Sequence, residues 1–316
     1  MDRNGVTRGM VAAAAERIAD HVRRTPVMEL PRGALGGDWV PVLKLEFLQH
    51  AGSFKPRGAF NSLLAQGIGA AGVTAASGGN HGAAVAFAAR RLGVPAQIFV
   101  PEIAAPAKVA AIRRFGATVT VGGARFDDAQ AACDAHAERT GALRIHPFAQ
   151  PLTIAGQGTL FREWETQAAV DTVLVAAGGG GLIAGAAAWW GGNGPRIVGA
   201  EPEGSRALHA ALEAGMPVDV TVHSIAADSL GARNVGELVY RTCAGSVDRV
   251  VLVGDAAISA AMRLLWQDFR IAAEPGGATA LAALIAGRYV PAAGERVGVL
   301  LCGANVDLDK LAEVAG

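Results

Sequence analysis

Short apolar runs alternate with amphipathic stretches along most of the chain. Apolar runs of strand length stand at 94–100, 117–121 and 142–145, and helical patterns separate them at 107–115 and 127–139. Parallel strands joined by crossover helices produce this alternation. The pattern therefore predicts a parallel sheet covered by helices.

A second series of the same kind begins after residue 147. Its apolar runs and helical patterns are found at 156–167, 172–177, 182–190, 196–200, 250–253, 255–269, 277–286 and 297–301. Two such series predict an α/β protein with two open twisted, mainly parallel sheets and helices on both faces of each. Ligands of such proteins bind in clefts beside the sheets, so we expect a site in the interdomain cleft.

Residues 173–192 carry no charged side chain and have the hydropathy of a membrane span. They include four consecutive glycines, Gly178–Gly181, and each glycine inside a helix costs about 1 kcal/mol relative to alanine. We therefore expect a buried strand, a glycine loop and a buried helix here, and no membrane.

Composition and charge exclude several partners. The chain has 316 residues with 28 basic and 28 acidic side chains, so its formal net charge is zero and nothing favours nucleic acid or an anionic membrane as partner. Three widely spaced cysteines and an N-terminus without an apolar signal core favour the reducing cytoplasm. Histidines and cysteines lack close metal-ligand spacing, so we assign no metal-ligating residue, and the sequence leaves the binding of a cation open.

Lysine is scarce in this chain, where it accounts for only four of the 28 basic residues. One of them, Lys55, follows Phe54 in a turn rich in Ser, Gly and Pro, before a helical pattern at 59–64. A solvated loop lysine is the ordinary interpretation. A lysine desolvated near a helix N-terminus would instead have a lowered pKa and could form a Schiff base.

Two loops of small residues stand between a predicted strand and a predicted helix. The first is 76–82, before a helix at 83–92, and the second is Gly178–Gly181. Bare backbone amides at a helix start bind phosphate or carboxylate, although an ordinary strand-to-helix turn looks the same. The second loop also fits the dinucleotide-binding pattern with Glu201 ending the next strand, and alone it would favour NAD.

Two further segments stand at predicted element ends. Cys302 follows an apolar strand, at the sheet edge where ligands bind, although a lone cysteine is more often a buried small hydrophobe. Glu274 precedes a predicted helix, whose first turn favours acidic residues.

These segments occur in a fixed order. They read EFLQHAGSFKPRGA at 46–59, SGGNHG at 77–82, GGGGL at 178–182, EPGGA at 274–278 and CGAN at 302–305. Together they resemble the pyridoxal-phosphate enzymes of the tryptophan-synthase-β fold (fold type II), specifically the threonine/serine dehydratase branch that includes serine racemase. The resemblance covers nearly the whole chain.

The resemblance implies a role for each matching residue. Lys55 would be catalytic and would hold pyridoxal 5′-phosphate as a Schiff base, Asn80 would bind the ring 3′-oxygen, and Cys302 would face the pyridine nitrogen. The implied cofactor-binding residues are Phe54, Lys55, Asn80, Gly178, Gly179, Gly180, Gly181, Leu182, Glu274 and Cys302. The residues implied to receive the substrate carboxylate are Ser77, Gly79, Asn80 and His81.

The branch implies β-elimination of L-threonine or L-serine to 2-oxobutanoate or pyruvate plus ammonia. Racemases of this fold place a second serine where this chain has Gly78, so Lys55 alone would act on Cα, which favours elimination. A thiol at position 302 holds no pyridinium proton and favours the same outcome. The alternatives are a serine racemase or 3-hydroxyaspartate dehydratase of this fold, an NAD-dependent oxidoreductase, and a non-catalytic small-molecule binding protein.

The resemblance also implies an organisation. We expect residues 1–70 and 147–316 to form a large cofactor-binding domain, and 71–146 a small mobile domain that closes on the substrate. A cytoplasmic homodimer is expected, and no C-terminal effector domain, because the chain stops shortly after the motif at 302–305.

Overall fold

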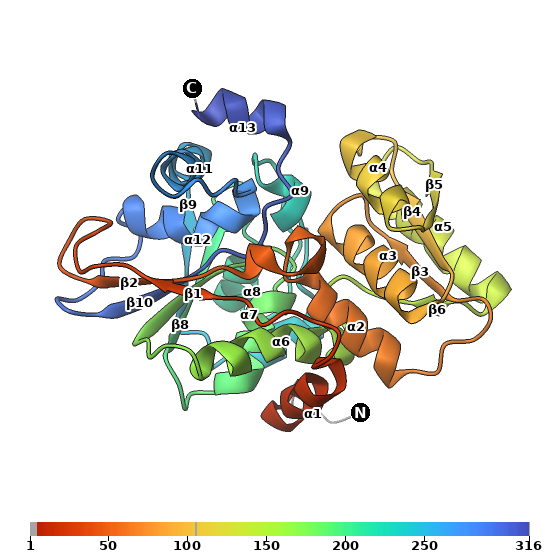
Figure 1. The fold of residues 1–316 in the computed structure, drawn as a ribbon, viewed down its shortest axis with the longest axis horizontal. Coiled ribbons are helices and arrows are strands. Elements are labelled where there is room, and N and C mark those ends of the chain that lie inside the picture. The colour runs from red at the N-terminus through yellow and green to blue at the C-terminus, as the bar shows by residue number, and fades with distance from the viewer. Residues whose placement is uncertain (1–4, 105, 316) are drawn as a thin grey trace.

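Two sheets organise the computed structural model, which describes residues 5–104 and 106–315 (Figure 1). The larger sheet has six strands, and only its edge strand β1 runs antiparallel to its neighbour. Its spatial order is β1 (Val27–Glu29), β2 (Val40–Lys44), β10 (Arg296–Leu300), β7 (Thr172–Ala176), β8 (Arg196–Pro202) and β9 (Arg249–Val253).

The smaller sheet is fully parallel and lies to the right in Figure 1. Its spatial order is β5 (Thr118–Val121), β4 (Ala96–Val100), β3 (Val73–Ala76) and β6 (Leu143–Arg144). Three helices accompany it, α3 (Asn80–Leu92), α4 (Pro106–Arg114) and α5 (Phe126–Thr140). We call residues 73–144 the small lobe, and the remaining described residues the large lobe.

The remaining helices belong to the large lobe. Among them α1 (Arg8–Ile18), α2 (Lys55–Ala65), α6 (Pro151–Glu165) and α7 (Gly181–Trp190) pack on one another, and α2 also contacts α3 of the small lobe. The others are α8 (Ala207–Ala214), α9 (Ala227–Leu230), α10 (Gly236–Cys243), α11 (Asp255–Phe269), α12 (Pro275–Ile285) and α13 (Leu308–Ala315), with 3-10 turns at Glu46–Leu48 and His50–Gly52.

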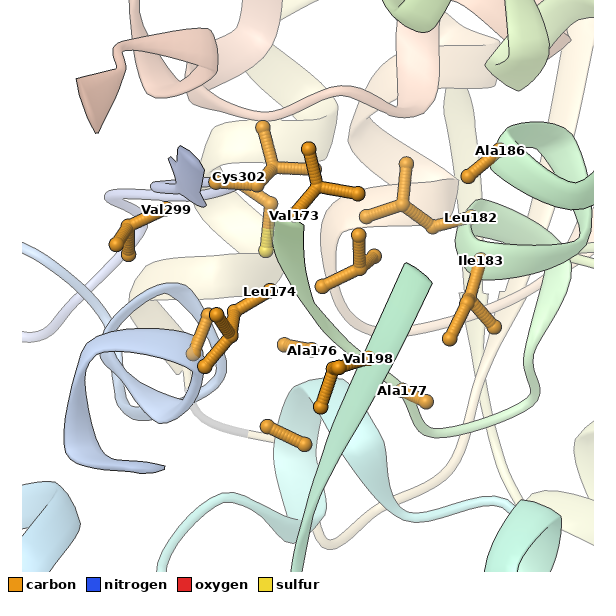
Figure 2. Packing of buried hydrophobic residues seen from close by; sticks show 14 of the residues in the cluster. Val173, Leu174, Ala176, Ala177, Leu182, Ile183, Ala186, Val198, Val299 and Cys302 are labelled. Atoms are coloured by element: carbon orange, nitrogen blue, oxygen red, sulfur yellow. The ribbon is translucent and has the colours of Figure 1, made fainter. Parts of the chain in front are cut away.

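The uncharged stretch 173–192 forms the centre of the large lobe. Every residue of β7 and of α7 is buried, and side chains of β7, α7 and β8 pack together around Val173, Ile183 and Val198 (Figure 2). Strand, glycine loop and helix therefore follow one another as the sequence predicts. Among the described residues, no helix has the length and apolar character needed to cross a membrane.

The sequence pattern predicted most strands and helices to within a few residues. It missed the edge of the large sheet, β1 and β2, together with α8, α9, α10 and α13. Strand β2 was missed because it contains Pro41 and ends on Lys44, which is fully buried beside ion-pair partners. A strand of this composition lacks the apolar run on which the prediction relies.

Two helices begin earlier than predicted, and both shifts matter for the site. Helix α2 starts at Lys55 instead of residue 59, and α3 starts at Asn80 instead of residue 83. Lys55 and Asn80 are therefore first-turn helix residues and not loop residues. The division into domains at 71–146 stays a prediction.

Candidate active site

The side chain of Lys55 lies beside the segment that follows β6. Its Nζ donates a hydrogen bond to the carbonyl oxygen of Pro147 at 2.9 Å, and lies 5.0 Å from the centre of the Phe54 ring. Burial lowers the pKa of the Lys55 amine to about 8. The amine therefore has an unprotonated fraction of about a tenth at pH 7, far more than an exposed lysine.

The glycine loop between β7 and α7 tolerates no side chain at all. A Cβ on Gly179 would lie 2.4 Å from the Phe148 ring, and one on Gly178 would lie 2.5 Å from the Leu230 backbone. Gly180 has φ +75°, in the left-handed region that L side chains rarely adopt. These contacts explain why the loop is built from glycine.

The same loop presents free backbone donors. It opens helix α7, whose N-cap Gly180 has no capping side chain. Among the described residues, no acceptor receives the backbone N–H groups of 178–183. Unpaired amides at a helix N-terminus attract anions, so the loop suits a phosphate group.

Segment 145–149 brings Lys55 and the glycine loop together. The carbonyl oxygen of Pro147 accepts a hydrogen bond from the Lys55 amine. The adjacent Phe148 fills the space that side chains at Gly179 and Gly181 would need. No function could be assigned to this segment from the sequence alone. Its only signal was that His146 and Pro147 separate the two α/β series, which says nothing about contacts.

Asn80 links the two lobes through a hydrogen-bonded trio. Its Nδ2 donates to Glu274 Oε1 at 2.6 Å, and its Oδ1 accepts from Asn305 Nδ2 at 2.7 Å. Burial raises the pKa of Glu274 above its usual range. Two of the predicted cofactor-binding residues, Asn80 and Glu274, are thus in direct contact. Asn305, although part of the CGAN motif, was not singled out from the sequence.

Cys302 lies just past the end of β10 and is buried, as Figure 2 also shows. Its thiol donates to the carbonyl oxygen of Gly276 at 3.6 Å. Burial raises the pKa of the thiol well above its ordinary value. Cys302 is therefore a neutral group throughout the physiological range.

The loop predicted to receive a carboxylate is ordered by its own contacts. The hydroxyl of Ser77 accepts a hydrogen bond from the Gly79 amide, and His81 Nε2 lies 2.9 Å from the carbonyl oxygen of Ile145. Burial lowers the pKa of His81 to about 3, so the ring is neutral and its Nε2–H donates to Ile145. The His81 side chain is thereby committed to the protein, which leaves backbone amides for an anion.

Gly78 faces the interior of the small lobe. A Cβ built there would lie 2.7 Å from the Ala104 Cβ and 2.9 Å from Val100 Cγ1. A serine at this position would have to displace Ala104 before it could reach a ligand. The backbone geometry at 78 thus directs any side chain toward the interior of the small lobe.

A cleft of about 600 Å³ opens between the two lobes. Neither Lys55 nor Cys302 nor the glycine loop is among the residues that line it. The small lobe contributes Gly79, Asn80 and Lys108, and the large lobe contributes Asp228 and Glu274. The predicted interdomain cleft is therefore present.

Glu201 does not have the freedom that a nucleotide-binding acid needs. It is fully buried, and its carboxylate accepts hydrogen bonds from the backbone N–H groups of Leu208 and His209, at the start of α8. Burial raises its pKa to about 8. The carboxylate is used inside the fold, which contradicts the NAD alternative.

Metal binding finds no support among the described residues. They contain no group of three or more His, Cys, Asp or Glu side chains arranged to hold an ion, and their three cysteines are free.

Comparison with known proteins gives a consistent result. A model of the family described as pyridoxal-phosphate dependent enzyme matches residues 18–303. The phenylserine dehydratase of Ralstonia pickettii is 42% identical over 97% of this chain and 95% of that protein. The biosynthetic L-threonine dehydratase IlvA of Salmonella typhimurium is 40% identical over 92% of this chain, but the match spans only 58% of that protein.

Solved structures show the same likeness. Maize serine racemase superposes with a TM-score of 0.91 at 36% identity, covering 98% of this chain and 96% of the other. The serine racemase of Dictyostelium discoideum superposes with a TM-score of 0.87 at 32% identity, covering 96% of this chain and 99% of the other.

Proposed function

This chain belongs to the family of pyridoxal-phosphate-dependent enzymes, and we propose that it is an ammonia-lyase that eliminates the β-hydroxyl and the amino group of L-threonine or L-serine. The products are 2-oxobutanoate or pyruvate, and ammonia. One observation carries the proposal. The Lys55 amine, with a pKa of about 8, hydrogen-bonds Pro147, whose neighbour Phe148 lies on the glycine loop.

The residues present fit the cofactor. The glycine loop leaves no room for a Cβ at Gly178 or Gly179, and the amides of 178–183 lack acceptors among the described residues, as a phosphate-binding loop requires. Lys55 supplies an amine that is reactive near neutral pH, as bonding to an aldehyde requires. We therefore assign the phosphate to this loop and the aldehyde carbon to Lys55.

Lys55 is the base of the reaction in this proposal. When bound, the cofactor withdraws electrons from Cα of the amino acid and so acidifies the Cα–H bond. The Lys55 amine takes the Cα proton at Nζ, and a pKa near 8 suits that task at neutral pH. The carbonyl of Pro147 holds the amine by a hydrogen bond while it carries this proton.

The other site residues bind and orient. The neutral Cys302 thiol offers no negative charge to hold a proton on the pyridine nitrogen, which suits elimination of a leaving group. Asn80 would hold the cofactor from the small lobe. The amides of Gly78, Asn80 and His81, which have no acceptor among the described residues, would bind the substrate carboxylate, whereas the amides of Ser77 and Gly79 are already bonded within the protein. Closure of the predicted small domain, residues 71–146, would exclude water during the reaction.

The substrate class follows from the shared chemistry of the relatives. They bear the names phenylserine dehydratase, L-threonine dehydratase and serine racemase. Phenylserine, threonine and serine are all β-hydroxy amino acids, so each offers a hydroxyl on the carbon next to Cα. We extend the proposal to β-hydroxy amino acids in general, with threonine and serine as first candidates.

A substrate panel tests this proposal. The purified holoenzyme is incubated with the L and D forms of serine, threonine, phenylserine and 3-hydroxyaspartate, and both 2-oxo acid and ammonia are measured. Equal amounts of both products from an L-hydroxy amino acid are expected, and none from the Lys55→Ala variant. Chiral chromatography of the residual substrate tests racemisation. Inversion without 2-oxo acid formation would overturn the proposal in favour of a racemase.

The assembly and compartment are part of the proposal. We propose a cytoplasmic homodimer, because the resemblance implies a dimer and the cysteines are free. Light scattering on the eluting holoenzyme distinguishes a dimer from a monomer of 32.1 kDa.

A further inference from the structure

The six residues 145–150 contact three functional segments of the site. They connect β6 of the small lobe to α6 of the large lobe. The carbonyl oxygen of Ile145 accepts a hydrogen bond from the ring N–H of His81, and that of Pro147 accepts one from the Lys55 amine. The Phe148 side chain lies against the glycine loop. The conformation of this one segment therefore sets the positions of several groups that must meet at the reacting carbon.

His146 determines how this segment folds. Its Nδ1 accepts hydrogen bonds from the backbone N–H groups of Phe148 at 3.3 Å and Ala149 at 2.9 Å. These bonds close a tight turn around Pro147 and leave its carbonyl pointing to the lysine. The backbone of His146 is held as well, because its N–H donates to Gln150 and its carbonyl accepts from Thr153.

Only an unprotonated Nδ1 can accept these bonds. Burial lowers the pKa of His146 to about 4, with Lys55 and Arg144 acting in the same direction and Asp134 opposing them. The ring is therefore neutral near pH 7, and the two amides fix its proton on Nε2. Nδ1 can therefore accept both hydrogen bonds near pH 7.

We propose that His146 is a positioning residue, whose Nδ1 folds the segment 146–149 so that Pro147 holds the Lys55 amine and Phe148 supports the glycine loop. The proposal rests on Lys55 being the reactive amine. In this role His146 is not a catalytic histidine, because it needs no bond to substrate or cofactor. It also differs from a residue needed only for stability, because its loss should lower the reactivity of Lys55.

Three substitutions separate these possibilities. In His146→Asn the side-chain oxygen takes the place of Nδ1 and can accept the same backbone bonds. In His146→Gln the amide reaches the place of Nε2 and leaves that of Nδ1 empty. His146→Leu offers neither group. Circular dichroism and thermal unfolding identify the variants that remain folded.

Two measurements are made on each folded variant. The first is kcat and KM for the best hydroxy amino acid. The second needs no turnover: the cofactor is removed, and the rate at which Lys55 recaptures pyridoxal phosphate is followed by visible absorption. We expect His146→Gln and His146→Leu to lose about 10- to 100-fold in kcat and in capture rate, as misplacement of a reacting group by about 1 Å does. His146→Asn should stay within about 3-fold of the parent enzyme, because Asn keeps the acceptor.

The opposite ranking overturns the proposal. If His146→Gln is active and His146→Asn is not, the function belongs to Nε2. Equal rates in all folded variants would show that His146 has no positioning role. If His146→Leu and His146→Gln do not fold, while His146→Asn folds and keeps the parental kcat and capture rate, the Nδ1 acceptor is needed for folding alone and the proposal also fails. The capture rate keeps this test separate from the proposed lyase reaction, since it is measured whether or not a hydroxy amino acid is consumed.

Discussion

Lys108 Nζ lies 2.7 Å from Asp228 Oδ2, and this ion pair joins α4 of the small lobe to α9 of the large lobe. Both side chains line the cleft. The loop that we propose binds the substrate lies next to Asp228, since a Cβ on Gly79 would lie 3.5 Å from the Asp228 carbonyl oxygen. The pair therefore bridges the two lobes where they would close on a substrate.

We expect Lys108→Ala to raise KM by about 2- to 5-fold with little change in kcat, because an exposed ion pair contributes about 0.2–1 kcal/mol. Steady-state kinetics at low and high salt checks this expectation. Salt should raise the KM of the parent enzyme and leave that of the variant unchanged. Glu237→Gln, which removes an exposed ion pair inside α10, is the matched control and should leave KM unaltered.

The pKa of Lys55 predicts how cofactor capture depends on pH. Only the unprotonated amine attacks the aldehyde, so the capture rate of cofactor-free enzyme should rise with pH up to about 8 and level off above it. A plateau reached only at about pH 10 would show an ordinary exposed lysine. Lys55→Ala should show no visible band at any pH, whereas Lys108→Ala should retain it.

Gly179→Ala tests the proposed phosphate-binding loop. The added Cβ would lie 2.4 Å from the Phe148 ring, so the loop or the ring must move. We expect the variant to fold and to bind pyridoxal phosphate at least about 10-fold more weakly, which corresponds to about 1.4 kcal/mol. Titration of the cofactor-free protein measures this affinity. Gly67→Ala, where a Cβ meets open space, should bind normally.

A buried ion-pair network supports helix α2 from behind the site. Arg57, two residues after Lys55, pairs with Glu46 at 2.6 Å and with Glu163 at 2.9 Å, and Glu163 also pairs with the fully buried Lys44. Burial alone would raise the pKa of Glu163, but Arg57 and Lys44 outweigh it and hold that pKa below its usual value.

Glu163→Gln should lower the free energy of unfolding by about 3 kcal/mol, because it leaves two buried cations with too little compensating charge. Denaturant unfolding at pH 7 measures the loss. Because the folded pKa of Glu163 lies below the unfolded one, this stability is present above about pH 4.5 and is lost as the pH falls through the folded pKa. Glu165→Gln, at an exposed pair on the same helix, should change stability by less than about 1 kcal/mol.

Most of the fold could be predicted from the sequence, since strands and helices with a clear period are specified by their own residues. The buried β7 and the helix α7 show this best, because their apolar side chains pack on each other with no polar partner needed. β2 escaped prediction because its burial depends on partners far along the chain, such as Glu163 for Lys44.

The chain itself determined the chemical groups, and the tertiary structure decided which of them meet. Lys55, the four glycines and Cys302 are recognisable in the sequence because a reactive amine, a side-chain-free loop and a small buried group each need one residue type. The use of Glu201 within the fold and the turn held by His146 depend on hydrogen bonds to backbone groups three to eight residues away, and the direction of a side chain at 78 depends on the packing of Val100 and Ala104. The hydrophobic period does not encode those contacts, because they depend on the directions of backbone groups and on burial, which are set only when the elements of each lobe have packed.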